Sequence, residues 1–440
     1  MDSYSLALMM IAGLLVLIFA GIPVAFSIAA VGIVFGLIGV GDFMFNLLPA
    51  RIFGVITNYT LLAIPLFVFM GVLLEKSRIA ESAIDVVGHL AGDRPGGMAI
   101  AIIVIGVLMG ASTGIVGATV VAVGLITLPK LLARGYHPSL ASGTICASGT
   151  LGQIIPPSLL IILLADIMGE SVGELFAAAI VPSMLLAALY VIYLIVLGRL
   201  VPHHAPPLPQ AERDAMGRGE LWLKVVKTVV PPVLLVVAVL GSIIGGVAAP
   251  TEAASIGALG AMVIVAAMGR LDMATLKQTM RDTLKLTGMI MFVLIAAQAF
   301  ALSFRLLGGE EIIGDLFDWV PGGTMGAILF MLLILFILGF FLEWIEISYI
   351  VLPLMLPVFA AADVDVIWLA MLVTLVLQTS FLTPPFGWAL FFLKGVAPPE
   401  VRTRDLYLGV LPFIGLQLVT LAIVLIFPSV ATGLPQSMGW

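Results

Sequence analysis

Charged residues are scarce in this sequence. Asp, Glu, Lys and Arg make up 10% of its 440 residues, hydrophobic residues make up 62%, and the mean hydropathy is +1.25. A soluble globular domain has about a quarter of its residues charged, so this composition excludes one. The apolar runs are long and do not alternate, which excludes an outer-membrane barrel. The composition predicts an all-α polytopic membrane protein in a lipid bilayer, and it predicts no nucleic-acid partner.

Cysteine and the usual hydrolase motifs are also scarce. The one cysteine, Cys146, lies in an apolar run and can form no internal disulfide. His203 and His204 are adjacent, but no further Cys or His accompanies them as a metal site would require. There is no His-Glu-x-x-His, and no Gly-x-Ser-x-Gly accompanied by a membrane-embedded histidine. An intramembrane hydrolase is therefore the weakest alternative, and we expect no enzyme, no metal centre and no cofactor.

Two double prolines interrupt apolar runs where a helix would otherwise continue. One lies within Gly149–Ser158 and the other within Gln378–Gly387. Successive prolines remove two backbone donors, and the neighbouring glycines let the chain unwind. Polar backbone freed at membrane depth is tolerated only where it is buried in protein or lines a wet cavity. Both interruptions are therefore candidate binding sites.

Punctuating prolines recur in the same order at an offset of about 227 residues. Pro23 pairs with Pro250, Pro95 with Pro321, Pro129 with Pro357, and the first double proline with the second. Such duplication is common in secondary transporters. We expect an inverted repeat with about ten crossing helices, two re-entrant helical hairpins and two broken helices. The expected units are a first repeat over 1–200 (hairpin about 97–133, broken helix about 139–166), a cytoplasmic linker over 201–227, and a second repeat over 228–440 (hairpin about 324–362, broken helix about 366–393).

The lysines and arginines predict an orientation. If both termini are periplasmic, all of them except Arg51 and Arg305 fall in cytoplasmic segments. This asymmetry follows the positive-inside rule and favours a multi-pass protein of the bacterial inner membrane with both termini outside. The segment Ile79–Leu90 is expected to lie along the cytoplasmic interface.

Each hairpin tip should meet the unwound loop of the broken helix that follows it, which gives two related sites. Helix N-termini suit a carboxylate, whereas hydroxyls and unwound carbonyls suit a sodium ion. The first sodium or substrate site is expected at Ser112, Thr113, Gly114, Gly149, Thr150, Gly152, Pro156, Pro157 and Ser158. The second is expected at Gly339, Glu343, Glu346, Ser348, Thr379, Ser380, Thr383, Pro384, Pro385 and Gly387.

A plainer interpretation competes at several of these positions. Single Ser, Thr and Gly residues commonly just pack membrane helices together, although packing requires no double proline. Glu343 and Glu346 could bind a cation, relay a proton, or lie near the outer interface, where an acid costs little. An ion channel is a further alternative, but no rings of charged or carbonyl ligands suggest a pore.

Over essentially its whole length the chain resembles the large membrane subunit of TRAP (tripartite ATP-independent periplasmic) transporters, within the ion transporter superfamily. The residues that carry the resemblance are Asn58–Phe67, Gly117–Thr119 through Pro129, Gly149–Gly152 with Ile155–Ser158, Pro250–Ala254 and Thr383–Gly387.

The resemblance implies sodium-coupled uptake of a small organic acid by an elevator mechanism, with Na+ as the coupling ion. It also implies two partners: a periplasmic substrate-binding protein that delivers the acid, and a small four-helix membrane subunit, expected as a separate chain. The nearest alternative is a free-standing dicarboxylate or citrate symporter of the same superfamily.

Overall fold

The computed structural model describes residues 3–113, 116–210, 212 and 217–440, without the side chains of 111–113 and 218. Within these residues the secondary structure is helical, with no strand. Helices follow from the composition, because an apolar segment in lipid must satisfy its backbone hydrogen bonds internally. The prediction of an all-α membrane fold is confirmed.

The helices of residues 3–200 include two short 3₁₀ helices before α4 and one after α8. Their bounds are α1 (Ser3–Phe19), α2 (Val24–Gly39), η1 (Gly41–Phe43), α3 (Met44–Ile56), η2 (Thr60–Leu62), α4 (Ala63–Lys76), α5 (Ile79–Leu90), α6 (Gly97–Thr113), α7 (Val116–Ala133), α8 (Pro138–Thr150), η3 (Leu151–Gln153), α9 (Leu159–Met168) and α10 (Val172–Leu200).

The remaining helices include one π-helical turn, η5. Their bounds are η4 (Pro202–His204), α12 (Arg218–Thr228), α13 (Val230–Ile244), α14 (Pro250–Ala267), α15 (Met273–Leu306), α16 (Gly309–Asp318), α17 (Gly323–Leu338), α18 (Trp344–Glu346), η5 (Ile347–Val351), α19 (Leu352–Ala361), α20 (Val366–Leu382), α21 (Trp388–Val396), α22 (Thr403–Ile426) and α23 (Ser429–Ser437).

Local sequence fixes several helix ends. The Asp272 carboxylate accepts a hydrogen bond from the Thr275 N–H at 2.6 Å and starts α15, and Asp365 does the same for the Trp368 N–H at 2.9 Å at the start of α20. Such side-chain caps satisfy donors that have no partner within the helix. At the other end, Gly169 follows α9 with φ of 75°, a conformation that glycine adopts without strain.

Length and composition identify seven helices that could cross a membrane, or up to nine if two bent pairs each count as one span, among the described residues. Both broken helices fall outside this set because each half is too short. α1 and α2, at 17 and 16 residues, are just below the usual span length of about 20.

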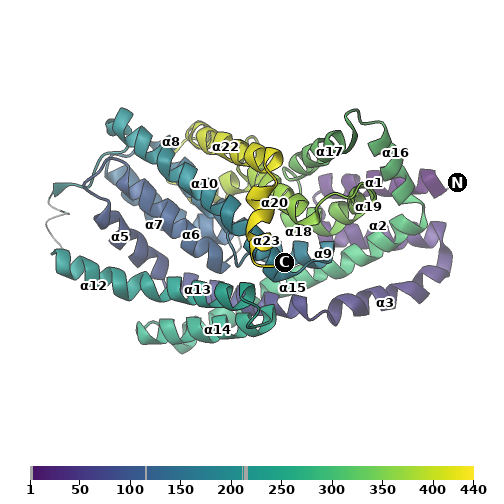
Figure 1. The fold of residues 1–440 in the computed structure, drawn as a ribbon, viewed down its shortest axis with the longest axis horizontal. Helices are drawn as coiled ribbons and strands as arrows, with labels where there is room; N and C mark the ends of the chain where they lie inside the picture. The colour runs from purple at the N-terminus through teal and green to yellow at the C-terminus, as the bar shows by residue number, and fades with distance from the viewer. Residues whose placement is uncertain (1–2, 114–115, 211, 213–216) are drawn as a thin grey trace.

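The helices pack in two groups. In one, α15 contacts α2 and α4, and α14 contacts α4 and α13. In the other, α8 contacts α6, α7 and α22, and α20 contacts α10 and α22. Figure 1 shows α5 to α8 at one end of the molecule, α1 to α3 with α16 at the other, and α20 and α22 near the middle. The groups meet where α6 contacts α4 and α13.

Glycine permits the closest contacts within each group. In the first, a β-carbon at Gly32 would lie 2.6 Å from the backbone nitrogen of Phe300, and the Ser303 hydroxyl donates to the Gly32 carbonyl at 2.7 Å. In the second, a β-carbon at Gly143 would lie 3.0 Å from the Cα of Gly409. Small residues at such crossings let membrane helices approach backbone to backbone.

Candidate functional site

The first double proline breaks a helix, as predicted. α8 ends at Thr150, the η3 turn follows, and α9 starts only at Leu159, after an extended Ser158. Every residue from 151 to 160 is buried, including Pro156 and Pro157. Neither hydroxyl in this segment is free: Thr150 donates to the Ala147 carbonyl at 3.0 Å, and Ser158 donates to the Gln153 carbonyl. Their oxygens keep lone pairs that can still accept a hydrogen bond or bind a cation.

The unwound segment lies against the end of α6. A β-carbon at Gly152 would lie 2.7 Å from the Cα of Gly110, and Gly149 approaches Val120 of α7. The end of α6, in the region where the first hairpin is expected, therefore contacts the first break. α6 extends to Thr113, so Ser112 and Thr113 belong to the helix rather than to an interruption. Their side chains, and Gly114, lie outside the described residues.

The second double proline also breaks a helix. α20 ends at Leu382 and α21 begins at Trp388. Pro384 is half-buried, Pro385 is exposed and Gly387 is buried. The three predicted hydroxyls donate to carbonyls of their own helix: Thr379 to Leu375, Ser380 to Leu377 and Thr383 to Thr379, each at 2.7 Å.

The second hairpin region meets this break through Gly339. A β-carbon there would lie 2.7 Å from the Cβ of Ser380. Glu346 receives the backbone N–H of Glu343 at 3.0 Å and so caps the short helix α18, a structural role that the sequence did not indicate. Ser348 lies in η5 and is fully buried, and its hydroxyl has no hydrogen-bond partner within the described part of the chain.

Glu343 lines a cavity of about 380 Å³ in which residues from both halves of the chain meet. This volume lies within the range of small-molecule sites. Glu343 is the only one of the predicted site residues among the described lining, which is otherwise apolar and contains no lysine or arginine. The lining residues are Val116, Gly117, Ala118 and Val121 of α7, Leu159 of α9, Leu286, Met289 and Ile290 of α15, Glu343, Trp344, Ile345, Phe381 of α20 and Phe392 of α21.

A family model described as "Tripartite ATP-independent periplasmic transporter, DctM component" matches residues 11–430. The chain belongs to this family. It is 31% identical over 401 residues to the C4-dicarboxylate TRAP transporter large permease protein DctM of Pseudomonas aeruginosa, covering 89% of this chain and 90% of the relative. It is 27% identical to the sialic acid TRAP transporter large permease protein SiaM of Vibrio cholerae (96% and 97% covered) and 26% identical to the ectoine TRAP transporter large permease protein TeaC of Halomonas elongata (96% and 97% covered).

Among solved structures, the YdaH transporter of Alcanivorax borkumensis aligns with a TM-score of 0.54 at 15% identity, over 91% of this chain and 90% of that one. At this identity the likeness concerns the fold alone. These three curated relatives are transporter permeases, so the chain is a TRAP large permease and not a hydrolase.

Two glutamines of this TRAP permease were not among the predicted site residues. Gln153 in η3 and Gln378 in α20 are fully buried, and neither end of either amide has a hydrogen-bond partner in the described residues. Leaving a buried polar group unpaired costs about 1 to 3 kcal/mol. Binding of a water, an ion or a substrate atom by each amide would remove this cost. The signal in the sequence is a single glutamine within each broken apolar run.

The TRAP permease also contains a cluster around Asp166 near the end of α9. The Asn58 amide donates to Asp166 Oδ1, and the Tyr349 hydroxyl donates to Asp166 Oδ2 at 2.7 Å. The Asn58 carbonyl oxygen in turn accepts the Thr60 N–H at 2.9 Å. One carboxylate thus ties together the turn before α4, the first broken helix and η5. Of these residues, only Asn58 and Thr60 lie in a motif that the sequence singled out.

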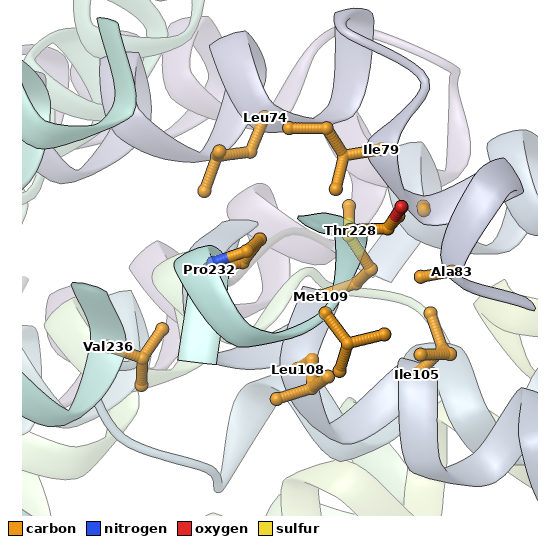
Figure 2. Close-up of a pocket in the computed structure, with 11 residues that line it drawn as sticks. Leu74, Ile79, Ala83, Ile105, Leu108, Met109, Thr228, Pro232 and Val236 are labelled. Atoms are coloured by element: carbon orange, nitrogen blue, oxygen red, sulfur yellow. The ribbon is translucent and has the colours of Figure 1, made fainter. Parts of the chain in front are cut away.

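A much smaller cavity lies between the two packing groups. It has a volume of about 20 Å³, room for about one water, and it is lined by apolar side chains of α4, α5 and α6 and by the junction of α12 and α13. Figure 2 shows Leu74, Ile79 and Met109 facing this space, with the Thr228 hydroxyl among them. It is too small for an organic acid, unlike the cavity beside Glu343.

Proposed function

We propose that the chain carries out sodium-coupled secondary active uptake of a small organic acid that a periplasmic binding protein delivers. The observation that carries this proposal is the cavity beside Glu343, which joins α7, α9, α15 and the region of the second hairpin. Its membership of the TRAP family provides the transporter class, and the cavity provides a place for cargo.

The described lining of this cavity offers an acid no basic side chain. Backbone donors are the alternative. α9 starts at the cavity wall at Leu159, and its N-cap has no side-chain hydrogen bond. Free N–H groups and the positive end of a helix favour an anion. We therefore assign recognition of the carboxylate to the start of α9, together with a bound cation.

The cation is proposed to lie at the two unwound segments. Sodium takes oxygen ligands, and the buried amide oxygens of Gln153 and Gln378 lack partners in the described structure. The hydroxyls of Thr150 and Thr379 and nearby carbonyls supply further oxygens. The predicted ligands Ser112 and Thr113 would complete the first site from the end of α6.

The elevator movement is proposed to occur along the seam between the two packing groups. The α6, α7, α8, α20 and α22 group would move, and the α2, α4, α13, α14 and α15 group would stay. The cavity in Figure 2 lies on this seam, and its apolar walls offer few hydrogen bonds that sliding would have to break. The inverted repeat over 1–200 and 228–440 belongs to the same proposal.

The proposed partners are a small membrane subunit and a periplasmic binding protein, at the inner membrane with both termini periplasmic. The range Gly219–Ile244 is the least covered of the span candidates, with 17% of its apolar window buried. We assign this face, together with α14, to the small subunit.

Reconstitution in liposomes tests the function. The chain and its small subunit would be reconstituted together, and labelled succinate, sialic acid and ectoine would be offered with and without the binding protein and an inward sodium gradient. We propose a C4-dicarboxylate as the cargo, because the relative at 31% identity is named for one. Uptake only with both the binding protein and sodium supports the proposal.

The free-standing symporter is the alternative, and the same assay separates the two. Vigorous uptake by this chain alone, without the binding protein or the small subunit, would favour the symporter. Uptake that is unaffected by removal of sodium would exclude sodium coupling.

A further inference from the structure

A second cavity, of about 630 Å³, lies outside the proposed transport site. It is formed by the loop between α5 and α6 and by the last turns of α10. α10 is long and apolar enough to cross a membrane, and the cavity lies at its C-terminal end, near Leu200.

Backbone contact brings the loop onto α10. A β-carbon at Gly198 would lie 2.9 Å from the carbonyl carbon of Pro95, so only glycine permits this approach. Gly96 has φ of 82°, a left-handed conformation suited to glycine, and its N–H donates to the Ala205 carbonyl at 2.8 Å. As a result, Arg94 from the loop and Arg199 from α10 line one cavity.

The charges in this cavity are unbalanced. Arg94 and Arg199 face a single carboxylate, Asp93, and neither guanidinium has an ion pair or a side-chain hydrogen bond to any described residue. Neighbouring basic residues differ, since Lys130 pairs with Asp85 at 2.9 Å and Arg134 with Glu212 at 2.7 Å. The cavity therefore has two guanidiniums available for an anion.

The rest of the wall is apolar. Leu90 and Ile195 are 38% and 36% exposed, and Val87 and Ile100 line the same cavity. Exposed aliphatic side chains beside two arginines suit a ligand with an anionic head and hydrocarbon chains better than a free anion. Basic pockets at the ends of membrane helices bind anionic lipid headgroups on the same principle.

The geometry points to a site for an anionic phospholipid, with phosphatidylglycerol as the simplest example. The guanidiniums of Arg94 and Arg199 bind the phosphate, in bidentate fashion where the planar groups allow it. Leu90 and Ile195 contact the acyl chains. The site holds a structural lipid of the membrane and is independent of the transported acid.

Thermal unfolding of the purified full-length chain, with its small subunit if the two copurify, tests this site. The delipidated protein in neutral detergent would be titrated with phosphatidylglycerol, phosphatidylcholine or inorganic phosphate. We expect phosphatidylglycerol to raise Tm, and the other two to have little effect at the same concentration. Native mass spectrometry would count the bound lipid.

Variants locate the binding. The double variant Arg94→Gln with Arg199→Gln should weaken phosphatidylglycerol binding about tenfold or more, because it removes two charged hydrogen-bond donors. The double variant Arg94→Lys with Arg199→Lys keeps the charge and should retain part of the preference. Arg281→Gln, at an exposed position on α15, is the matched control and should bind as the parent does.

Three outcomes would overturn the proposal. Inorganic phosphate that saturates the effect would identify a site for a soluble anion. Phosphatidylcholine that binds equally well would show that the arginines do not select the headgroup. Unchanged phosphatidylglycerol binding by the double glutamine variant would place the lipid elsewhere.

Discussion

Both double-proline segments break a helix, but their surroundings differ. Pro156 and Pro157 are buried, as is every residue beside them, whereas Pro385 is exposed and Phe386 is 40% exposed. The first segment is closed by backbone contact between Gly110 and Gly152. The second is covered on one side by Gly339 against Ser380 and is open on the other. Both segments contain a double proline, but in this conformation only the second has exposed residues.

The largest effect is expected when a side chain is forced into the closed segment. Gly152→Ala places a β-carbon 2.7 Å from the Cα of Gly110, and overpacking of this kind costs about 1 to 3 kcal/mol. We expect a lower Tm and loss of most uptake. Gly395→Ala is the control, because nothing lies within 4 Å of its added carbon. Equal effects of the two substitutions would show that the Gly110 contact does not matter.

Substitution of the buried glutamine in each segment tests whether its side chain binds a ligand or only packs. Gln153→Met and Gln378→Met each remove an unpartnered polar group, so we expect an unchanged or higher Tm. If these amides bind sodium, the sodium concentration for half-maximal uptake should also rise, by about tenfold for the loss of one charged-group contact.

Gln417→Met is the matched control for these two variants. Gln417 is a fully buried glutamine of α22, outside both segments, and its side chain interacts with Tyr190. It should change Tm without affecting sodium dependence. The same sodium shift in all three variants would argue against the proposed cation sites.

The sequence predicted these segments because proline acts locally. Two successive prolines beside glycine remove two N–H donors at one place, so both breaks could be placed without a structure. The bounds of α5, Ile79–Leu90, are also those of the segment predicted from the sequence. The role of Asp166 could not be predicted. Its partners Asn58 and Tyr349 lie 108 and 183 residues away, and no local pattern connects them.

α3 was not among the predicted segments. Pro49 lies within this helix, so a single proline does not by itself mark a break. The different environments of the two double prolines were also hidden, because exposure depends on how distant helices pack. The cavity beside Glu343 could not be predicted either, because its walls come from helices distant in the sequence, among them α7, α15 and α21.

Chemical labelling measures the difference in access directly. In a Cys146→Ala background, Phe386→Cys should react with a membrane-impermeant maleimide at least about tenfold faster than Ile155→Cys, because Ile155 is only 4% exposed. Mass spectrometry of the labelled protein would give both rates. Comparable rates would mean that the first segment also opens. The side from which Phe386→Cys reacts would test the predicted orientation.

The smallest effect is expected from a change of pH. It arises near the start of α8, the helix that ends at the first double-proline segment. The pKa of His204 is lowered from its ordinary value of 6.5, first by burial and then by the nearby charges of His137 and His203. Near pH 6.5 the unfolded chain therefore binds more protons than the folded chain. Acidification from pH 7.5 to 5.5 should accordingly lower Tm. His204→Gln should reduce that drop by about 1 °C. An identical pH profile for the variant would assign the drop to other groups.

The contact of Gly110 with Gly152 has a mechanical consequence. Two main chains meet there with no side chain between them that could change rotamer and make room. A displacement of the end of α6 toward the η3 turn must therefore push the turn along with it.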